Sequence, residues 1–244
     1  MQNQQPSTLK EIRVHGTQDF PCAFYQTGTR IRGNMVKHHW HEEVELLYFS
    51  GGEFCLEINM ERFEISEECF YFINPGELHS ISVEKNGGCV ENAVVFHMDM
   101  LSSAYALDQI QTNLIQPVQN GSIQFPRCLR KNEPAFEPVR KSYEEIRNVF
   151  GGDSFRENYY DGEAVTDDIT RQLFIKSALL RILAVLSANN LFEVTEKNHD
   201  HRIETIKTTL TYIQENYKEK IYIRDLAGLI GMNEQYFCRF FKKV

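Results

Sequence analysis

Three histidines and one glutamate occupy two short stretches of the chain, and their types and spacing suit the binding of a metal ion. His39, His41 and Glu45 lie in the first stretch, and His79 lies in the second. Residues two and four apart on a strand point to the same face, so the first three share one face if their strand is continuous. Three imidazoles and a carboxylate suit Zn, Fe, Mn or Ni. Alternatively, the four groups form a polar network that only stabilises the fold.

Short strands surround these four residues. Runs rich in β-branched and aromatic residues are bounded by glycine, proline and asparagine, which is typical of strands separated by turns. One such turn, Asn74-Pro75-Gly76, follows a fully apolar run and brings His79 beside the first three side chains. The pattern predicts about eight strands in the first hundred residues, at 20–26, 31–36, 44–49, 53–58, 63–65, 69–73, 80–83 and 91–98, and hence a jelly roll or small barrel.

The two stretches together resemble the double motif of the cupin family. The match consists of Gly33, His39, His41, Glu45 and Gly52 in the first half and Gly76 and His79 in the second. The sequence departs from the family pattern at Asn74, where proline is usual. The resemblance implies a small β-barrel with a ligand pocket at its mouth.

The middle of the chain predicts helices. Val139, Tyr143, Ile146 and Phe150 have helical spacing, and the glycines that follow are typical of a helix end. Residues 167–191 form the longest predicted helix, and apolar residues cover so much of it that one partner surface cannot bury them all. We therefore expect one side to pack on the barrel and residues 136–192 to form a homodimer. Burial of this helix within one monomer is the alternative.

Residues 203–244 have the pattern of a helix-turn-helix unit. An amphipathic helix is predicted by the spacing of Ile203, Ile206, Leu210, Ile213 and Tyr217. A short helix over 223–230 and a second over 234–243 flank a break at Gly231-Met232-Asn233, and asparagine is a good N-cap. Two short helices joined by a tight glycine-bearing turn place the second one to enter a DNA major groove.

This unit resembles the first helix-turn-helix of AraC/XylS-type transcription regulators. The matching residues are Ile223, Leu226, Ala227, Ile230, Gly231, Met232, Asn233, Tyr236, Phe237, Arg239, Phe240, Phe241, Lys242 and Lys243. In that family a cupin-like sensing domain precedes the DNA-binding domain, and dimer-forming helices follow the barrel, which is the order of this chain. The family mostly uses the barrel pocket for a small organic effector, for example a sugar, so the resemblance implies that His39, His41, Glu45 and His79 line an effector pocket.

The resemblance also implies which residues of the second short helix face DNA. They are Gln235, Tyr236, Cys238, Arg239, Lys242 and Lys243. Arginine reads guanine and glutamine reads adenine in the major groove, whereas lysines contact phosphates. An ion pair of Arg239 with Glu234 or Glu215 is the structural alternative. The family has two helix-turn-helix units, and this sequence contains only the first, so we expect weak DNA binding from it.

Composition bounds the class of protein. The 244 residues carry a formal net charge of −8, yet residues 203–244 hold 7 Lys/Arg against 5 Asp/Glu, a mildly basic end that hints at nucleic acid. The six cysteines form no CxxC pair, which suits free thiols in a reducing cytoplasm. The N-terminus is not a signal peptide, and no apolar run approaches the ~20 residues that cross a bilayer.

We therefore predict an α+β protein: a cupin-like barrel with an N-terminal arm at 1–116, connecting and dimerisation helices at 117–192, a linker at 193–202, and a helix-turn-helix unit at 203–244. Residues 1–19 of the arm are expected to be loose and polar. The predicted function is a cytoplasmic, ligand-responsive regulator of transcription with double-stranded DNA as partner, no catalytic residues and no required cofactor. The alternative is a metal-dependent cupin enzyme, an isomerase or dioxygenase, with a helical tail.

Overall fold

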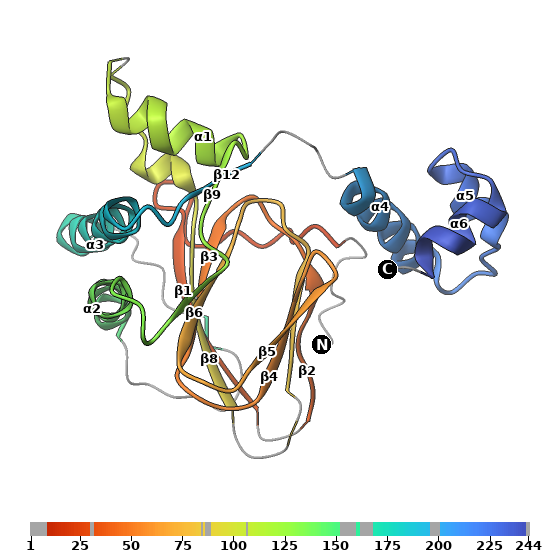
Figure 1. Cartoon of the computed structure of the whole chain (residues 1–244), viewed down its shortest axis with the longest axis horizontal. Helices are drawn as coiled ribbons and strands as arrows, with labels where there is room; N and C mark the ends of the chain where they lie inside the picture. The colour runs from red at the N-terminus through yellow and green to blue at the C-terminus, as the bar shows by residue number, and fades with distance from the viewer. Residues whose placement is uncertain are drawn as a thin grey trace.

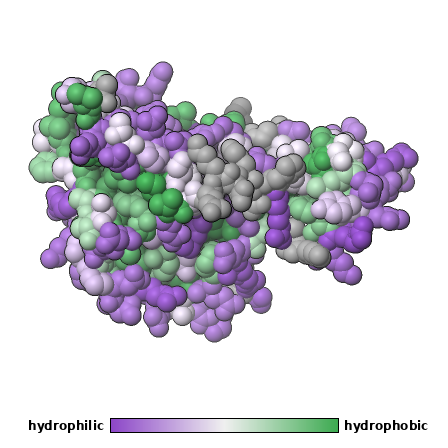
Figure 2. Space-filling view, turned by 45° about the horizontal axis from the view of Figure 1, so that its top comes forward, coloured by the Kyte–Doolittle hydropathy of each residue, from purple (hydrophilic) through white to green (hydrophobic). Residues whose placement is uncertain are grey.

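The computed structural model describes residues 9–29, 32–83, 85, 89–105, 107–151, 160–161, 168–195 and 201–242. Its larger lobe is a barrel of two antiparallel sheets with helices on one outer face, and its smaller lobe consists of three helices (Figure 1). In Figure 2, apolar side chains gather mainly on the larger lobe, with a smaller group in the helical lobe. The predicted α+β architecture, a barrel followed by helices, is confirmed.

The barrel is a sandwich of a six-stranded and a four-stranded sheet. The orders are β10-β6-β3-β8-β1-β11 and β2-β7-β4-β5, and neighbouring strands are antiparallel. Eight strands in the first hundred residues correspond to the predicted ones: β1 Cys22–Thr29, β2 Gly33–His39, β3 Val44–Phe49, β4 Phe54–Ile58, β5 Glu61–Ile65, β6 Cys69–Ile73, β7 His79–Val83 and β8 Cys89–Phe96. The six-stranded sheet also contains the short strands β10 (Cys128–Arg130) and β11 (Tyr160–Asp161).

The six-stranded sheet is buried on both faces, which explains the nearly continuous apolar runs of its strands. In β3, Val44 and Leu46 pack outward with the helices, whereas Leu47 and Phe49 point into the barrel. The inner face meets side chains of the four-stranded sheet such as Leu56. Alternation along each strand therefore divides the apolar residues between a barrel core and a helix-facing core.

Two helices that pack against each other cover the outer face of this sheet (Figure 1). α2 (Phe136–Val149) ends at Gly151, which adopts a positive φ of 91°, and α3 (Ile169–Ala188) starts at Asp168, whose carboxylate accepts hydrogen bonds from two backbone amides. One face of α3 is buried, but Ile169, Leu173 and Phe174 are each more than half exposed. Along the chain, β8 and α2 are separated by short elements that include η1 (Met98–Leu101), η2 (Gln111–Ile115), α1 (Gln116–Gln119) and β9 (Ile123–Gln124). β9 pairs with β12 (Glu193–Val194).

The chain crosses from one sheet to the other between His39 and Val44, so the condition for a shared strand face of His39, His41 and Glu45, a continuous strand, is not met. β2 ends at His39 in the four-stranded sheet, and β3 begins at Val44 in the six-stranded sheet. The four residues between them bridge the open end of the barrel. Side chains from both sheets can therefore meet there, which a single strand face would not allow.

A buried ion pair holds the turn that precedes His79. The Arg127 guanidinium donates to both oxygens of the Glu77 carboxylate, at 2.7 and 2.5 Å, and also to the carbonyl oxygen of Phe72 at 3.0 Å. Glu77 in turn accepts from the backbone amide of Asn74 at 2.8 Å. A bidentate guanidinium–carboxylate pair has a fixed geometry, so it sets the conformation of the turn and the direction in which β7 starts.

Asn74 has a structural role that proline could not take. Its side-chain oxygen accepts a hydrogen bond from the amide of Phe125 at 2.8 Å, and its own amide is the donor to Glu77. Proline has no amide hydrogen and no side-chain acceptor. The departure from the cupin pattern at Asn74 is therefore explained by this link between the turn and the segment that carries Arg127.

The smaller lobe contains α4 (His201–Asn216), α5 (Ile223–Leu229) and α6 (Glu234–Phe241). It packs against the barrel mouth and the arm through a cluster in which Leu9, Leu78 and Ile206 are buried. The expectation of a loose arm is wrong for its described part, because Leu9 and His15 are both buried. None of the described helices has both the length and the apolar character needed to cross a membrane.

We predict that replacing Arg127 with alanine lowers the free energy of unfolding by about 2–3 kcal/mol. The change leaves the buried Glu77 carboxylate without its counter-charge, and breaking buried pairs costs several kcal/mol, reduced here because the Arg127 side chain is 29% exposed. Urea denaturation measures the effect. The control is Lys131→Ala, which removes an ion pair with Glu68 whose lysine is 68% exposed and which we expect to change stability by less than about 0.5 kcal/mol. Equal losses in the two variants would contradict the role given to Arg127.

Candidate ligand site and candidate DNA-binding face

The four side chains singled out in the sequence meet at one end of the barrel. His39 ends β2 and lies directly opposite His79, the first residue of β7. The ring centroids of these two residues are 4.2 Å apart, and that of His41 lies 5.6 Å from His39 and 5.1 Å from His79. One ring nitrogen from each histidine lies within 4.8 Å of the others. Glu45, near the start of β3, reaches the same group from the opposite sheet.

Backbone carbonyls orient all three rings in the same way. Nδ1 of His39, His41 and His79 lies 2.9, 3.2 and 2.8 Å from the carbonyl oxygens of Lys37, Glu43 and Glu77. A carbonyl oxygen only accepts, so each Nδ1 carries the hydrogen, and in the neutral ring Nε2 keeps its lone pair. The same arrangement orients histidine ligands of metals in proteins.

The carboxylate of Glu45 lies between two of these rings. Its Oε2 is 3.0 Å from Nε2 of His79 and 3.4 Å from Nε2 of His41, and none of these three buried atoms has a well-formed hydrogen bond. Burial raises the pKa of Glu45, but its contacts with His41 and His79 outweigh burial and hold the pKa well below its ordinary value. Burial, together with repulsion from His79, lowers the pKa of His39 to about 4.

Neutral imidazoles in this orientation raise the free energy of the site when they lie beside the ionised Glu45 carboxylate. Lone pairs on Nε2 and on the Glu45 oxygen face one another, and buried polar atoms without partners cost free energy. A proton on a ring, or a cation between the groups, removes that cost. Three imidazole nitrogens and one carboxylate oxygen are a donor set for divalent Zn, Fe, Mn or Ni, so the residues present fit a metal ion.

The barrel interior behind these four residues is filled with side chains. Phe49, Phe54, Leu56 and Tyr71 point into it and are all buried. Phe49 contacts both Phe54 and Tyr71, with ring centroids 4.8 and 6.2 Å apart. A ligand at His39, His41, Glu45 and His79 is therefore limited to the mouth of the barrel.

Two further residues of this cluster, Glu11 and His15, were missed in the sequence. They come from the arm, more than twenty residues before His39. The Glu11 carboxylate lies 3.4 Å from Nε2 of His39 and 3.5 Å from Nε2 of His15. Burial raises the pKa of Glu11, but the close approach of His15 and the attraction of His39 outweigh it and lower the pKa. In the sequence, only the spacing of four residues between Glu11 and His15 could have indicated that they act together, and this spacing is too common to predict a site.

The neighbours of the site also have defined contacts. His38 binds the Glu57 carboxylate through Nε2 at 3.0 Å. Trp40 packs on both the arm and a helix: the ammonium of Lys10 lies 4.8 Å from the centre of its ring, and that of Lys207 lies 4.5 Å from it. Lys207 belongs to α4.

The helical lobe presents one face of α6 to solvent. Asn233 caps the helix by accepting a hydrogen bond from the amide of Tyr236 at 2.8 Å. Phe237 is buried against α5 residues including Leu226, so the opposite side of α6 is exposed. Exposed on it are Gln235, Tyr236, Cys238, Arg239 and Lys242, whereas Lys243 lies outside the described residues.

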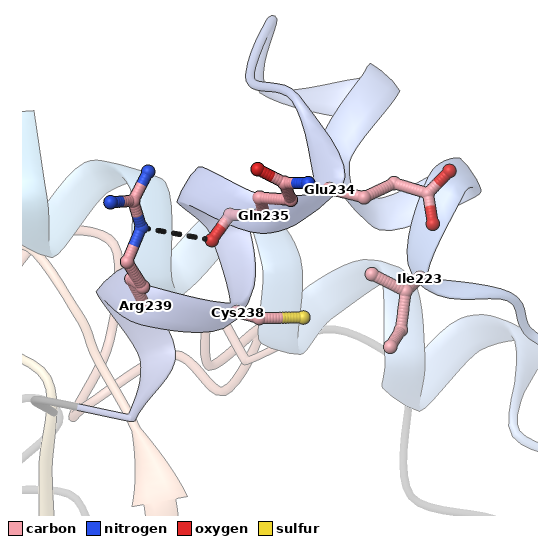
Figure 3. A pocket seen from close by; sticks show the side chains of 5 residues that line it. All are labelled: Ile223, Glu234, Gln235, Cys238 and Arg239. Atoms are coloured by element: carbon pink, nitrogen blue, oxygen red, sulfur yellow. Dashed lines mark hydrogen bonds between the residues drawn. The ribbon is translucent and has the colours of Figure 1, made fainter.

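Figure 3 shows the shallow surface hollow beside this face, lined by Ile223, Glu234, Gln235, Cys238 and Arg239. The Arg239 side chain extends from α6, and its Nε donates to the carbonyl oxygen of Gln235 at 3.4 Å. The guanidinium group keeps further N–H donors for other partners. Arg239 is therefore exposed on the surface. Its contact with DNA remains a prediction.

Comparison with known proteins places the chain in a family. Residues 24–148, just over half of the chain, match the AraC-like ligand binding domain. The chain belongs to this family. It is also 26% identical, over 97% of its own length and 75% of the relative's, to YdeC, an uncharacterized HTH-type transcriptional regulator of Bacillus subtilis.

Solved structures were also compared with this AraC-type chain. A point variant of apo ToxT from Vibrio cholerae aligns over 94% of this chain and 76% of its own at 10% identity, with a TM-score of 0.42. A cupin protein of Bacteroides fragilis aligns over 36% of this chain and 75% of its own at 16% identity, with a TM-score of 0.30. With a ligand-binding domain of this family and a regulator as a relative, the chain is a ligand-responsive transcription regulator.

We predict that the chain binds a divalent transition-metal ion and that His41→Ala reduces its affinity at least about tenfold, the scale on which even residues supporting a ligand matter. Competition of Co²⁺ or Ni²⁺ against a chelating dye measures this. The control is His38→Ala, a neighbouring histidine bound to Glu57, which should keep the affinity. Loss of binding in His38→Ala but not in His41→Ala would contradict the assignment.

Proposed function

We propose that this regulator senses a divalent transition-metal ion at the mouth of its barrel and passes the signal to the helix-turn-helix. His39, His41, Glu45 and His79 would hold the ion, and Gln235, Tyr236, Cys238, Arg239, Lys242 and Lys243 would contact DNA. The observation that supports the ion is the approach of the His41 and His79 Nε2 atoms to the buried Glu45 carboxylate, with a ring nitrogen of His39 within 4.8 Å of those of the other two histidines. A bound cation supplies positive charge there, and the residues of the chain orient its ligands.

An organic effector in the same place is the other sensing hypothesis from the family resemblance. It would have to bind at the mouth, because aromatic and aliphatic side chains fill the interior. A thermal-shift screen separates the two hypotheses, since a ligand of the native state raises the melting temperature. Stabilisation by metal ions alone supports the proposal, and stabilisation by an organic compound in the presence of chelator contradicts it.

The relationship to a transcriptional regulator supports regulation rather than catalysis. The metal-dependent cupin enzyme remains the competing hypothesis, because the same four ligands would serve it. The two differ in what the metal changes. If the ion alters DNA binding, the chain is a sensor; if it supports turnover of a small molecule without affecting DNA binding, the enzyme hypothesis replaces the proposal.

We also propose that the regulator forms a homodimer through residues 136–192. Ile169, Leu173 and Phe174 are more than half exposed on α3, and Leu180 is 42% exposed. Contiguous exposed apolar side chains favour association in water. The other face of α3 is already buried against α2 and the barrel, so the exposed face is the one available to a second chain.

A short route connects the ion site to the helical lobe. Trp40 stands between the ligands His39 and His41, and its ring contacts the ammonium of Lys207 on α4. Leu78 precedes the ligand His79 and is buried with Ile206 of α4. Any movement of the ligands on binding an ion therefore reaches α4 through directly bonded neighbours. An ion that binds two arrangements of α4 with different affinity shifts their populations.

We expect the chain to bind double-stranded DNA with an affinity that falls steeply as salt rises, because phosphate contacts release counterions. Arg239→Ala should weaken binding to a DNA sequence selected from a random library by about 5- to 100-fold, the range for loss of a base contact. Fluorescence anisotropy measures both. Arg171→Ala removes the same charge from α3 and should have little effect. Salt-independent binding, or equal effects of the two variants, would contradict the DNA-binding face.

We expect Lys207→Met to separate sensing from response. Methionine keeps much of the packing of a side chain that is only 10% exposed but removes its charge from Glu204 and from the Trp40 ring, the latter an interaction of about 0.5–2 kcal/mol. The variant should bind the metal as the parent does, while the effect of the metal on DNA affinity becomes smaller. Lys218→Met, which removes a similar contact with Tyr217, is the control. If the metal changes the DNA affinity of Lys207→Met as much as that of the parent chain, the proposed route from the ion site to α4 is contradicted.

A further inference from the structure

Two cysteines of the barrel lie next to each other at the edge of the six-stranded sheet. β10 is the edge strand and pairs with β6, so that Cys128 lies opposite Tyr71 and Arg130 lies opposite Cys69. Residues opposite each other on neighbouring strands point to the same side of the sheet, and so do residues two apart on one strand. Cys69, Tyr71 and Cys128 therefore share the inner side, where all three pack in the barrel core.

The two thiols differ in exposure and in ionisation. Cys69 is buried, whereas Cys128 is half-buried. The close approach of the Cys69 thiol and of the Tyr71 hydroxyl, with the charge of Arg130, outweighs burial and lowers the pKa of Cys128 to about 7. The approach of Cys128, together with burial, raises the pKa of Cys69. Because the thiolate is the nucleophilic form of cysteine, Cys128 is the reactive member of the pair.

The surroundings of Cys128 are unlike those of a cysteine that only fills the core. Cys22 lies in the same sheet and is fully buried, and burial alone raises the pKa of its thiol. Such a thiol is inert. The sulfur of Cys128 instead faces a thiol, a phenol and a cation, and its partial exposure gives a small oxidant access to it.

We infer that Cys128 and Cys69 form a thiol pair that hydrogen peroxide oxidises to a disulfide. In the first step the Cys128 thiolate attacks one peroxide oxygen: the S–O bond forms, the O–O bond breaks, and the leaving hydroxide takes up a proton to become water. The sulfur loses two electrons, and the peroxide gains them. In the second step the sulfur of Cys69 attacks that of Cys128: the S–S bond forms, the S–O bond breaks, and the hydroxide leaves as water with the thiol proton of Cys69.

The strand that carries Cys128 can make the small movement that closes this bond. Diagonal neighbours on antiparallel strands are about 7–8 Å apart, whereas the Cα atoms of a disulfide are usually about 4.4–6.8 Å apart. β10 has three residues and lies at the edge of the sheet, so it can shift toward β6. Cys128 directly follows Arg127, whose guanidinium holds the Glu77 carboxylate in the turn before His79. Oxidation therefore acts on a strand that is joined to this turn.

Mass spectrometry of the whole chain tests the pair directly. The reduced chain is treated with hydrogen peroxide, its remaining thiols are blocked with N-ethylmaleimide under denaturing conditions, and it is digested with trypsin. Trypsin cleaves after lysine and arginine, so it releases Cys69 in residues 63–85 and Cys128 in residues 128–130. We expect these two peptides to appear joined, lighter than their sum by two hydrogen atoms, and to separate again after reduction with dithiothreitol.

Three serine variants assign the two steps. Cys69→Ser keeps the reactive thiol and removes its partner, so Cys128 should accumulate as the sulfenic acid and be trapped by dimedone. Cys128→Ser should give neither the joined peptides nor a dimedone adduct on Cys69. Cys238→Ser is the control, because it removes an exposed thiol of α6, and it should keep the joined peptides. Circular dichroism melts of the reduced chains show whether each variant folds.

The outcome in the parent chain decides the inference even if a variant does not fold. At a peroxide dose that oxidises the exposed Cys238, recovery of both Cys69 and Cys128 with N-ethylmaleimide attached would overturn it. So would oxidation of Cys128 without a bond to Cys69. Metal affinity does not enter these measurements, so the proposed ion site is tested separately.

Discussion

Three imidazoles at the barrel mouth have their Nδ1 atoms bound to backbone carbonyls two residues away along the chain. This constraint turns the Nε2 atoms inward, where a buried carboxylate meets two of them. Because the backbone fixes the rings, the side chains cannot rotate to relieve the facing lone pairs. The fold therefore holds a buried carboxylate against two imidazole nitrogens that lack hydrogen bonds, and the proposed ion site and its proposed link to α4 both depend on this arrangement.

The scaffold that maintains this geometry is made from both sheets. His39 and His79 are paired across β2 and β7, whereas Glu45 belongs to β3 in the other sheet. The turn before His79 is held by Arg127 and Asn74, which connect it to the segment leading into β10. Packing of the two sheets on a shared core of Phe49, Phe54 and other apolar residues keeps the site's two halves at a fixed distance. The barrel core therefore acts as the support of the site and not as its cavity.

The residues proposed to hold the ion and those that touch the helical lobe alternate along two segments. Trp40 lies between His39 and His41, and Leu78 precedes His79. In extended chain, neighbouring side chains point to opposite sides, so one side of each segment faces the cluster and the other faces α4. The proposed sensor would therefore have its response element one residue away from its ligands, without a long relay through the core.

The amino-acid sequence by itself determined the strands, the helices and the four residues that meet in the proposed ion site, because these depend on local spacing and on motifs short enough to read in one element. The family resemblance also indicated which residues of α6 face outward. The tertiary structure alone decided that His39 and Glu45 come from different sheets, that Asn74 replaces proline in order to bind Phe125, and that Glu11 and His15 join the cluster. Those contacts depend on how two sheets and an arm pack together, and the spacing of residues along one segment carries no information about a partner that is distant in the chain.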